Sequence, residues 1–427
     1  MTPPSRPTPR LRALAVAAIA TIAVTACGGL VSPSPSPSPS PTATPQPTEA
    51  AASVDPKQVY ADIEAAVTGI RALEASDPVD PVVLDKQGIR DLMARTVRDD
   101  NPPELLAANE RLLRGLGLLP EDASLEDLYV ELLGGQVAGL YNPDDKELYV
   151  VSKTGNLGPT EKSTFAHEFT HALQDQNFGI DTLDMDEVGE GDRGIARLAL
   201  VEGDATLAMT YWQIQNLSQL ELLQMIGESL NPEISGGLEG MPPILRETLM
   251  FPYTQGLTFV QRLQAGGGWQ AVDDAYADPP ASTEQILHPE AYTAGELPVD
   301  VTLPDDLAAQ MGEGWSVGLE DTFGEFQLKL WLDQAAADAA ISTQASTGWG
   351  GDRIALLDGP DDAWAIAMDT AWDSELDASE FSDAATTVVN GLDGAGEVLP
   401  GADGRGVTVL LGSTDEVVDQ LRSALGR

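Results

Sequence analysis

Five consecutive residues, His167-Glu168-Phe169-Thr170-His171, carry the most specific chemical signal in the chain. The histidines are four positions apart, so on a helix both imidazoles project from one face and can bind one metal ion. Glu168 can then sit beside a metal-bound water and take its proton. The chain has 427 residues but only three histidines, so chance rarely produces this spacing. The alternative is a pair of helix histidines that pack without a metal.

The residues around this motif predict the elements that would position it. Pro159 and Glu161 suit a first helical turn, where proline fits and a carboxylate meets the positive end of the helix dipole. Gly179 is a helix stop signal. Upstream, residues 137–152 form two short apolar runs around a turn at 142–145, which predicts a β-hairpin. Its exposed edge would lie beside the metal and could pair with an extended peptide.

A catalytic zinc site needs a third protein ligand and an open fourth position for water. No other histidine lies close by, so a carboxylate is expected, and Glu202 in the helical run 195–215 is the best candidate. Gly203 weakens that helix, which suggests a close approach to the motif helix. Asp204 and Asp175 are both candidates to orient a ligand histidine through its second ring nitrogen. The alternative for Glu202 is an ordinary surface position.

The motif at 167–171, followed by the E-G-x-A segment at 202–205, resembles the gluzincin zinc metallopeptidases. The stretch 116–292 also resembles uncharacterised bacterial lipoproteins regarded as metallopeptidases, through GLYNPDDKELYVV, FAHEFTHALQDQNF, ALVEGDAT, FPYTQGLTFV and STEQILHPEAY. The resemblance implies a mainly helical zincin-like core with a small sheet before the motif helix. It also implies that His167, His171 and Glu202 bind one catalytic Zn²⁺, with Glu168 as general base. The long spacing from His171 to Glu202 departs from the best-known aminopeptidases of that group.

His288 is the third histidine, and Pro289 after it disfavours a helical conformation there. In some gluzincins a later histidine or tyrosine stabilises the oxyanion, so the resemblance suggests a catalytic role for His288, Tyr292 or Tyr253. The alternative for His288 is a loop position with a local hydrogen bond.

The N-terminal residues predict where the protein acts. Several arginines precede an apolar run at 14–24, which is typical of a signal peptide over residues 1–26. The run ends in Val24-Thr25-Ala26-Cys27, which resembles the bacterial lipobox and implies a lipid on Cys27, the only cysteine. Residues 27–54 are rich in serine and proline and predict a disordered stalk. We therefore expect a lipid anchor in the cell membrane and an extracytoplasmic domain; a plain secretory signal is the alternative.

The rest of the chain predicts an α+β protein. We expect residues 55–347 to form a zincin-like metallopeptidase domain with a helical N-terminal part. Residues 348–427 show patterns in the order strand–strand–helix–strand–helix and predict a C-terminal α+β subdomain. Structural support and a binding role are both compatible with that subdomain.

The chain is strongly acidic, with 68 acidic and 23 basic residues and a net charge of −45. This balance argues against nucleic acid as a partner, because phosphates require basic patches. The acidic loop 181–192 could bind calcium, although a solvated loop fits its irregular spacing better.

Two functional classes remain. The first is a membrane-anchored extracytoplasmic zinc peptidase that hydrolyses the peptide bonds of a peptide or protein substrate. The second is a noncatalytic envelope lipoprotein with a structural or vestigial metal site. Glu168 favours the first class, because a structural site needs no base.

Overall fold

The computed structural model describes residues 55–136, 139–151, 157–229, 240–336 and 338–427. The expected signal peptide, Cys27 and the stalk lie outside these ranges. In chain order the elements are α1 (Pro56–Arg71), β1 (Pro81–Leu84), α2 (Lys86–Asp100), α3 (Pro103–Gly115), α4 (Leu125–Gln136), β2 (Gly139–Asn142), β3 (Glu147–Val151), α5 (Pro159–Phe178), α6 (Gly191–Asn216), α7 (Gln219–Ser229), α9 (Pro243–Ala277), α10 (Thr283–Leu287), α11 (Pro289–Ala294), α12 (Leu307–Met311), β4 (Ser316–Asp321), α13 (Gly324–Asp333), α14 (Ala339–Ser346), β5 (Trp349–Asp358), β6 (Trp364–Trp372), α15 (Glu375–Val389), β7 (Ala395–Pro400), β8 (Gly406–Gly412) and α16 (Asp415–Ala424).

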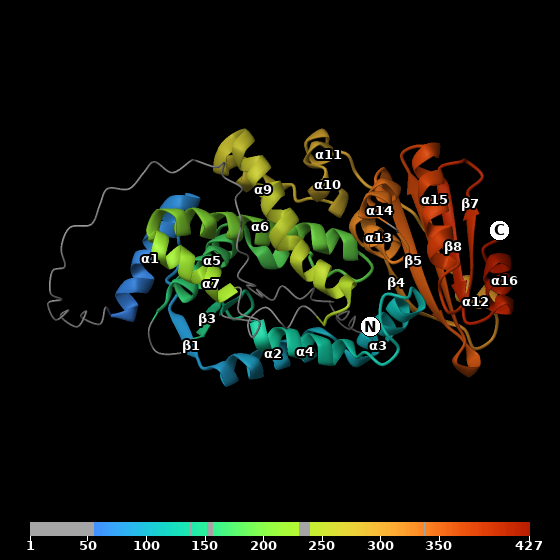
Figure 1. Ribbon diagram of the computed structural model, residues 1–427, viewed down its shortest axis with the longest axis horizontal. Coiled ribbons are helices and arrows are strands. Elements are labelled where there is room, and N and C mark those ends of the chain that lie inside the picture. The colour runs from blue at the N-terminus through green and yellow to red at the C-terminus, as the bar shows by residue number, and fades with distance from the viewer. Residues whose placement is uncertain (1–54, 137–138, 152–156, 230–239, 337) are drawn as a thin grey trace, which may run out of the picture.

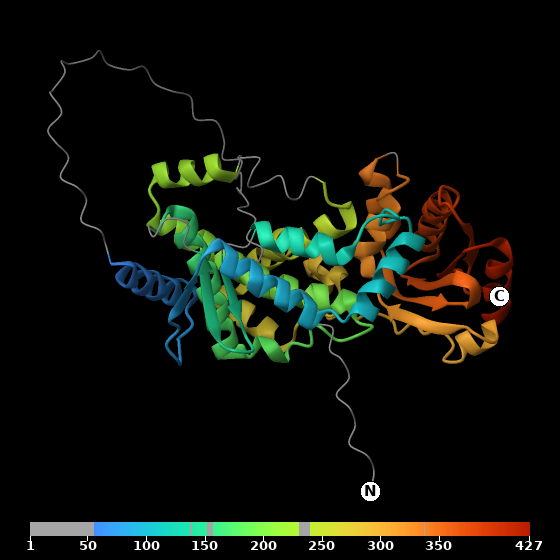
Figure 2. The ribbon, with the colours of Figure 1, turned by 90° about the horizontal axis from the view of Figure 1, so that it is seen from below.

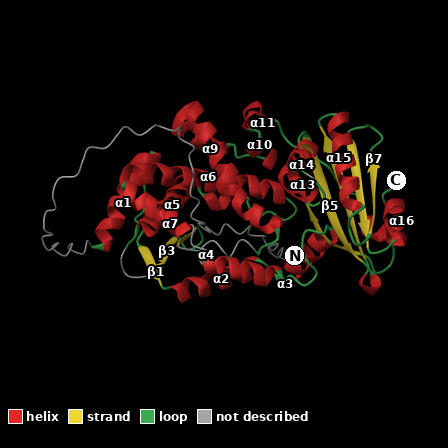
Figure 3. Ribbon diagram, viewed as in Figure 1, coloured by secondary structure: helices red, strands yellow, loops and turns green. Residues whose placement is uncertain are grey.

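The architecture is α+β, as the sequence predicts. Figure 3 shows helices throughout the described chain and strands gathered in two separate sheets. The small sheet has the order β1-β3-β2, in which β3 is parallel to β1 and antiparallel to β2. The predicted hairpin is therefore confirmed as β2 and β3. The large sheet has the order β4-β5-β6-β8-β7, and all its neighbouring strands are antiparallel.

The two sheets lie at opposite ends of the molecule, with the long helices α5, α6 and α9 between them (Figure 1 and Figure 2). Helix α6 packs extensively along α9 and also contacts α5. A Cβ atom on Gly203 would lie 2.2 Å from the carbonyl oxygen of Gly256. The close approach that Gly203 predicts is therefore made to α9 rather than to the motif helix, and it lets α6 and α9 pack nearly backbone to backbone.

The large sheet is covered on both faces, and the two faces bury different side chains. The face toward α13, α15 and the central helices continues the largest apolar core through the following residues: Ile354, Leu356, Ile366, Met368, Val409 and Leu411. The face toward α12 and α16 carries three alanines and two leucines: Ala355, Leu357, Ala365, Ala367 and Leu410. The central helices and the sheet thus share one continuous core.

The large sheet extends beyond the range 348–427 that the sequence assigns to a C-terminal subdomain. Its first strand is β4, which pairs with β5 from Ser316 onward. Helix α13 also precedes residue 348 and packs on α15 and β5, and α14 packs on α15. The strands at β5, β6 and β8 and the helices α15 and α16 agree with the predicted order, whereas β4 and β7 are additional. None of the helices in the described ranges is long and apolar enough to cross a bilayer.

Candidate metal centre

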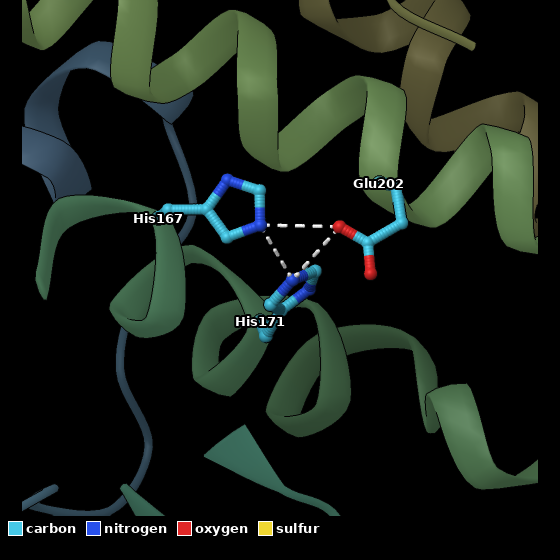
Figure 4. A group of neighbouring side chains, drawn as sticks. All are labelled: His167, His171 and Glu202. Carbon is cyan, nitrogen blue, oxygen red and sulfur yellow. Dashed lines mark hydrogen bonds and ion pairs between the residues drawn. The ribbon is translucent and has the colours of Figure 1, made fainter. Parts of the chain in front are cut away.

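Helices α5 and α6 bring His167, His171 and Glu202 together into one buried group (Figure 4). The Nε2 atoms of the two histidines are 3.0 Å apart. Glu202 Oε2 lies 3.1 Å from Nε2 of His167 and 3.4 Å from Nε2 of His171. The exposed fractions of the three residues are 1 %, 5 % and 3 %. The three residues that the sequence singles out therefore come together, and this group could hold a metal ion. It is the only such group among the residues that the structure describes.

Helix α5 is held rigidly because it is buried over most of its length. It begins at Pro159, and it ends where Gly179 adopts a left-handed conformation with φ of 66°. The N–H of Gly179 donates to the carbonyl of Asp175, which closes the last turn. Both ends agree with the sequence-based prediction. The ring centroids of Phe165 and of Tyr60 on α1 are 4.5 Å apart, so the face of α5 opposite the histidines is packed into the core.

Glu168 lies between the metal-binding group and the edge strand β2. Its Oε2 atom accepts a hydrogen bond of 2.8 Å from the backbone N–H of Tyr141 on β2. Its Oε1 atom is buried and has no hydrogen-bond partner among the described residues. Burial raises the pKa of Glu168 to about 8, although His171 opposes the shift. A carboxyl group with a pKa near neutrality can both take and return a proton.

Charges within the group oppose the effect of burial. Burial alone would lower the pKa of His171, but Glu202 outweighs it and raises that pKa to about 9. Burial would raise the pKa of Glu202, yet His171 and His167 hold it well below its ordinary range. The pKa of His167 is lowered, chiefly by burial and also by the neighbouring His171. The Glu202 carboxylate thus stabilises a positive charge beside it, as the raised pKa of His171 shows.

The group that orients His171 is Gln174, which the sequence analysis missed. His171 Nδ1 lies 2.8 Å from Gln174 Oε1. Neither carboxylate expected in this role contacts a ligand histidine directly. Asp175 accepts instead from the Tyr141 hydroxyl and from Lys146, and so ties the hairpin to α5. Asp204 reaches His171 only through Gln174. The spacing of three between His171 and Gln174 makes them neighbours on a helix, which is the only sequence signal for this contact.

The three candidates for an oxyanion donor lie in different surroundings. The ring of Tyr253 on α9 lies next to His167, with centroids 6.2 Å apart. The hydroxyl of Tyr292 donates to the carbonyl of Asp278. His288 Nε2 lies 3.0 Å from Oε1 of Glu325, a residue of α13. The structure thus places Tyr253 beside the metal-binding group.

The acidic loop before α6 is only partly solvated. Asp192 is buried and accepts hydrogen bonds from the backbone N–H and the hydroxyl of Thr283. Burial raises its pKa well above the ordinary range. Asp192 thus anchors the start of α6 to α10, and this loop contributes no metal-binding group in the described part of the chain.

Comparison with known proteins adds one result. A domain of unknown function, DUF8575, matches residues 313–422, which run from just before β4 into α16. No curated protein and no solved structure matches the chain. The matched family covers the large sheet and not the metal-binding group.

Proposed function

We propose that the protein is a zinc peptidase in which His167, His171 and Glu202 bind one zinc ion and Glu168 is the general base. The observation that carries this proposal is the convergence of two imidazole nitrogens and one carboxylate oxygen beside a buried second carboxylate. The gluzincin resemblance supports the same assignment.

The arrangement of donor atoms suits zinc. Tetrahedral zinc binds such ligands at about 2.0–2.2 Å, which places ligand atoms roughly 3.4 Å apart. The separations of 3.0, 3.1 and 3.4 Å in this group are close to that value. Three protein ligands are the number that catalytic zinc sites use, because the fourth position belongs to water or substrate.

Zinc in such a site supplies Lewis acidity, which makes water a nucleophile near neutral pH. Glu168 Oε1 accepts the proton that the attacking water loses and returns it to the leaving nitrogen of the peptide bond. The hydrogen bond from the Tyr141 N–H holds Oε2, so Oε1 is the oxygen that moves the proton. The ring of Tyr253 beside His167 supports this residue as the donor to the developing oxyanion.

The edge strand β2 supports an extended peptide as substrate. It pairs only with β3 within the small sheet, so its other side is an edge. A Cβ atom on Gly139 of β2 would lie 3.1 Å from Glu168 Cγ, so this strand borders the general base directly. A peptide added to β2 by backbone hydrogen bonds would run past Glu168 and would compete with its carboxylate for the Tyr141 N–H.

The test is cleavage of casein by the zinc-loaded protein, compared with Glu168→Gln. This variant should keep its zinc and lose about 10²–10⁴-fold in rate. Glu161→Gln, on the first turn of the same helix, is the matched control and should cleave as the wild type does. Full activity in Glu168→Gln would contradict the mechanism.

A second candidate is a noncatalytic lipoprotein with a structural metal site. The observation that favours it is burial, since Glu168 is 0 % exposed and no ligand exceeds 5 %. On this account zinc raises the melting temperature but the zinc-loaded wild type cleaves no peptide. Both candidates share the proposed lipid anchor on Cys27, which rests on the N-terminal sequence pattern.

A further inference from the structure

A series of buried, hydrogen-bonded polar side chains extends from His171 into the core. Gln174 accepts at Oε1 from the imidazole of His171, at 2.8 Å. Its Nε2 atom donates to the carbonyl of Val201 at 2.9 Å and to Asp204 Oδ2 at 3.0 Å. Gln174 and Asp204 are both fully buried, so every one of these bonds is made without competition from water.

These contacts fix which end of the Gln174 amide faces His171. The two neighbours on the far side, the Val201 carbonyl and Asp204, can only accept, so the amide NH₂ must point toward them. A reversed amide would set its oxygen against two acceptors. The amide oxygen therefore faces His171, and the imidazole must carry its proton on Nδ1. Nε2 is then the ring nitrogen that faces Glu202 and His167, and it is the nitrogen that would bind a metal ion.

Asp204 is itself held by two donors from other helices. Arg71 at the end of α1 donates from Nε to Asp204 Oδ1 at 2.7 Å. The hydroxyl of Tyr276 on α9 donates to Asp204 Oδ2 at 2.9 Å. Arg71 is 0 % exposed, pairs with Asp273 at 2.7 Å, and lies 4.6 Å over the ring of Trp269. A buried charge needs partners of opposite charge, and these contacts of Arg71 join α1, α6 and α9.

His167, the other histidine of the metal-binding group, has no equivalent hydrogen bond. His167 Nδ1 is buried without a hydrogen-bond partner in the described part of the protein. His171 is therefore the ligand whose ring position, with Nε2 facing the metal-binding group, is set by the protein before a metal arrives.

We infer that a hydrogen-bond relay holds His171 in the position of a metal ligand before the metal binds. The relay consists of Gln174, Asp204, Arg71 and Tyr276. They are positioning residues, because each acts through His171 rather than on substrate. The inference rests on the proposed metal site but not on peptidase activity. It predicts that breaking the relay weakens metal binding while the fold survives.

The test is zinc affinity, measured by competition with a chelator on the full chain. Gln174→Met keeps the side-chain volume and removes all three hydrogen bonds, so affinity should fall about 10–100-fold. Tyr276→Phe removes one hydroxyl and should weaken binding less; it keeps the test usable if Gln174→Met does not fold. Thr164→Val is the matched control, since Thr164 is also buried on α5 and its hydroxyl has no hydrogen-bond partner among described residues.

A second readout follows the proton itself. In ¹⁵N NMR spectra the Nδ1–H signal of His171 should exchange slowly in the wild type and rapidly in Gln174→Met. Assignment is simple because the chain has only three histidines. The relay is overturned if Gln174→Met and Tyr276→Phe change zinc affinity no more than Thr164→Val does, or if the Nδ1–H signal is unaltered. Wild-type protein that binds no zinc would overturn the relay and the metal site together. Zinc binding without casein cleavage would overturn only the peptidase proposal.

Discussion

His167 Nε2 and Glu202 Oε2 lie 3.1 Å apart, although the two residues are 35 positions apart in the chain. Their contact depends on how α6 packs, and α6 is fixed in turn by its close contact with α9 at Gly203 and Gly256. The geometry of the metal-binding group is therefore a property of helix packing as well as of the motif.

The first prediction concerns Gly203. Its Cβ atom in Gly203→Ala would meet the Gly256 carbonyl oxygen at 2.2 Å, so α6 and α9 must move apart. We expect the free energy of unfolding to fall by about 1–3 kcal/mol or more, and zinc affinity to fall with it because Glu202 shifts. Urea unfolding and chelator competition measure the two effects.

Gly227 on α7 is the matched control, because nothing lies within 4 Å of the Cβ position there. Gly227→Ala should stabilise the protein by about 0.5–1 kcal/mol through helix propensity. If Gly203→Ala were as stable as Gly227→Ala, the close helix contact would not be as described.

The second prediction concerns pH. Burial and the neighbouring carboxylates, first among them Glu325, raise the pKa of Glu284 from 4.5 to about 8. The folded protein therefore binds this proton more tightly than the unfolded chain does. The contribution of Glu284 to the free energy of unfolding is therefore fully present below about pH 4.5, and it is lost as the pH rises to about 8. With about 1.4 kcal/mol for each unit of pKa difference, the loss amounts to a few kcal/mol.

Glu284→Gln removes that titration. The variant should be more stable than the wild type at pH 8 and close to it at pH 5, as measured by urea unfolding at both values. Glu290→Gln changes an exposed carboxylate a short distance along the chain and should leave the difference between the two pH values unchanged. An equal effect of Glu284→Gln at both pH values would refute the burial argument.

The third prediction concerns the anchor. Cys27→Ala should prevent lipid attachment and move the protein from the membrane fraction to the soluble fraction. Mass spectrometry of the mature N-terminus should find a diacylglycerol on Cys27 in the wild type. An unmodified N-terminus downstream of Cys27 in a soluble wild-type protein would instead indicate plain secretion.

Local signals made the motif helix and the hairpin predictable. Pro159 and Gly179 mark the ends of α5 by their own backbone preferences, without reference to other parts of the chain. The turn at 142–145 marks the hairpin in the same way. The metal-binding set also follows from the sequence, because few residue types bind metal and histidine is rare in this chain.

Features that depend on distant packing were missed. Strands β4 and β7 lie at the two edges of the large sheet and bury few residues, so they lack the long apolar runs of the central strands. The role of Gln174 could not be separated from those of Asp175 and Asp204, because it depends on Val201 and Asp204 of another helix. Arg71 contacts Asp204 across 133 positions, which no local pattern records.

Metal content tests the central claim most directly. Elemental analysis and native mass spectrometry of the purified full chain should find one zinc ion for each molecule. Glu202→Gln should remove that zinc or weaken its binding strongly, because it replaces an anionic ligand by a neutral amide. Protein without stoichiometric metal, or Glu202→Gln with wild-type zinc affinity, would contradict the assignment of His167, His171 and Glu202 as a zinc site.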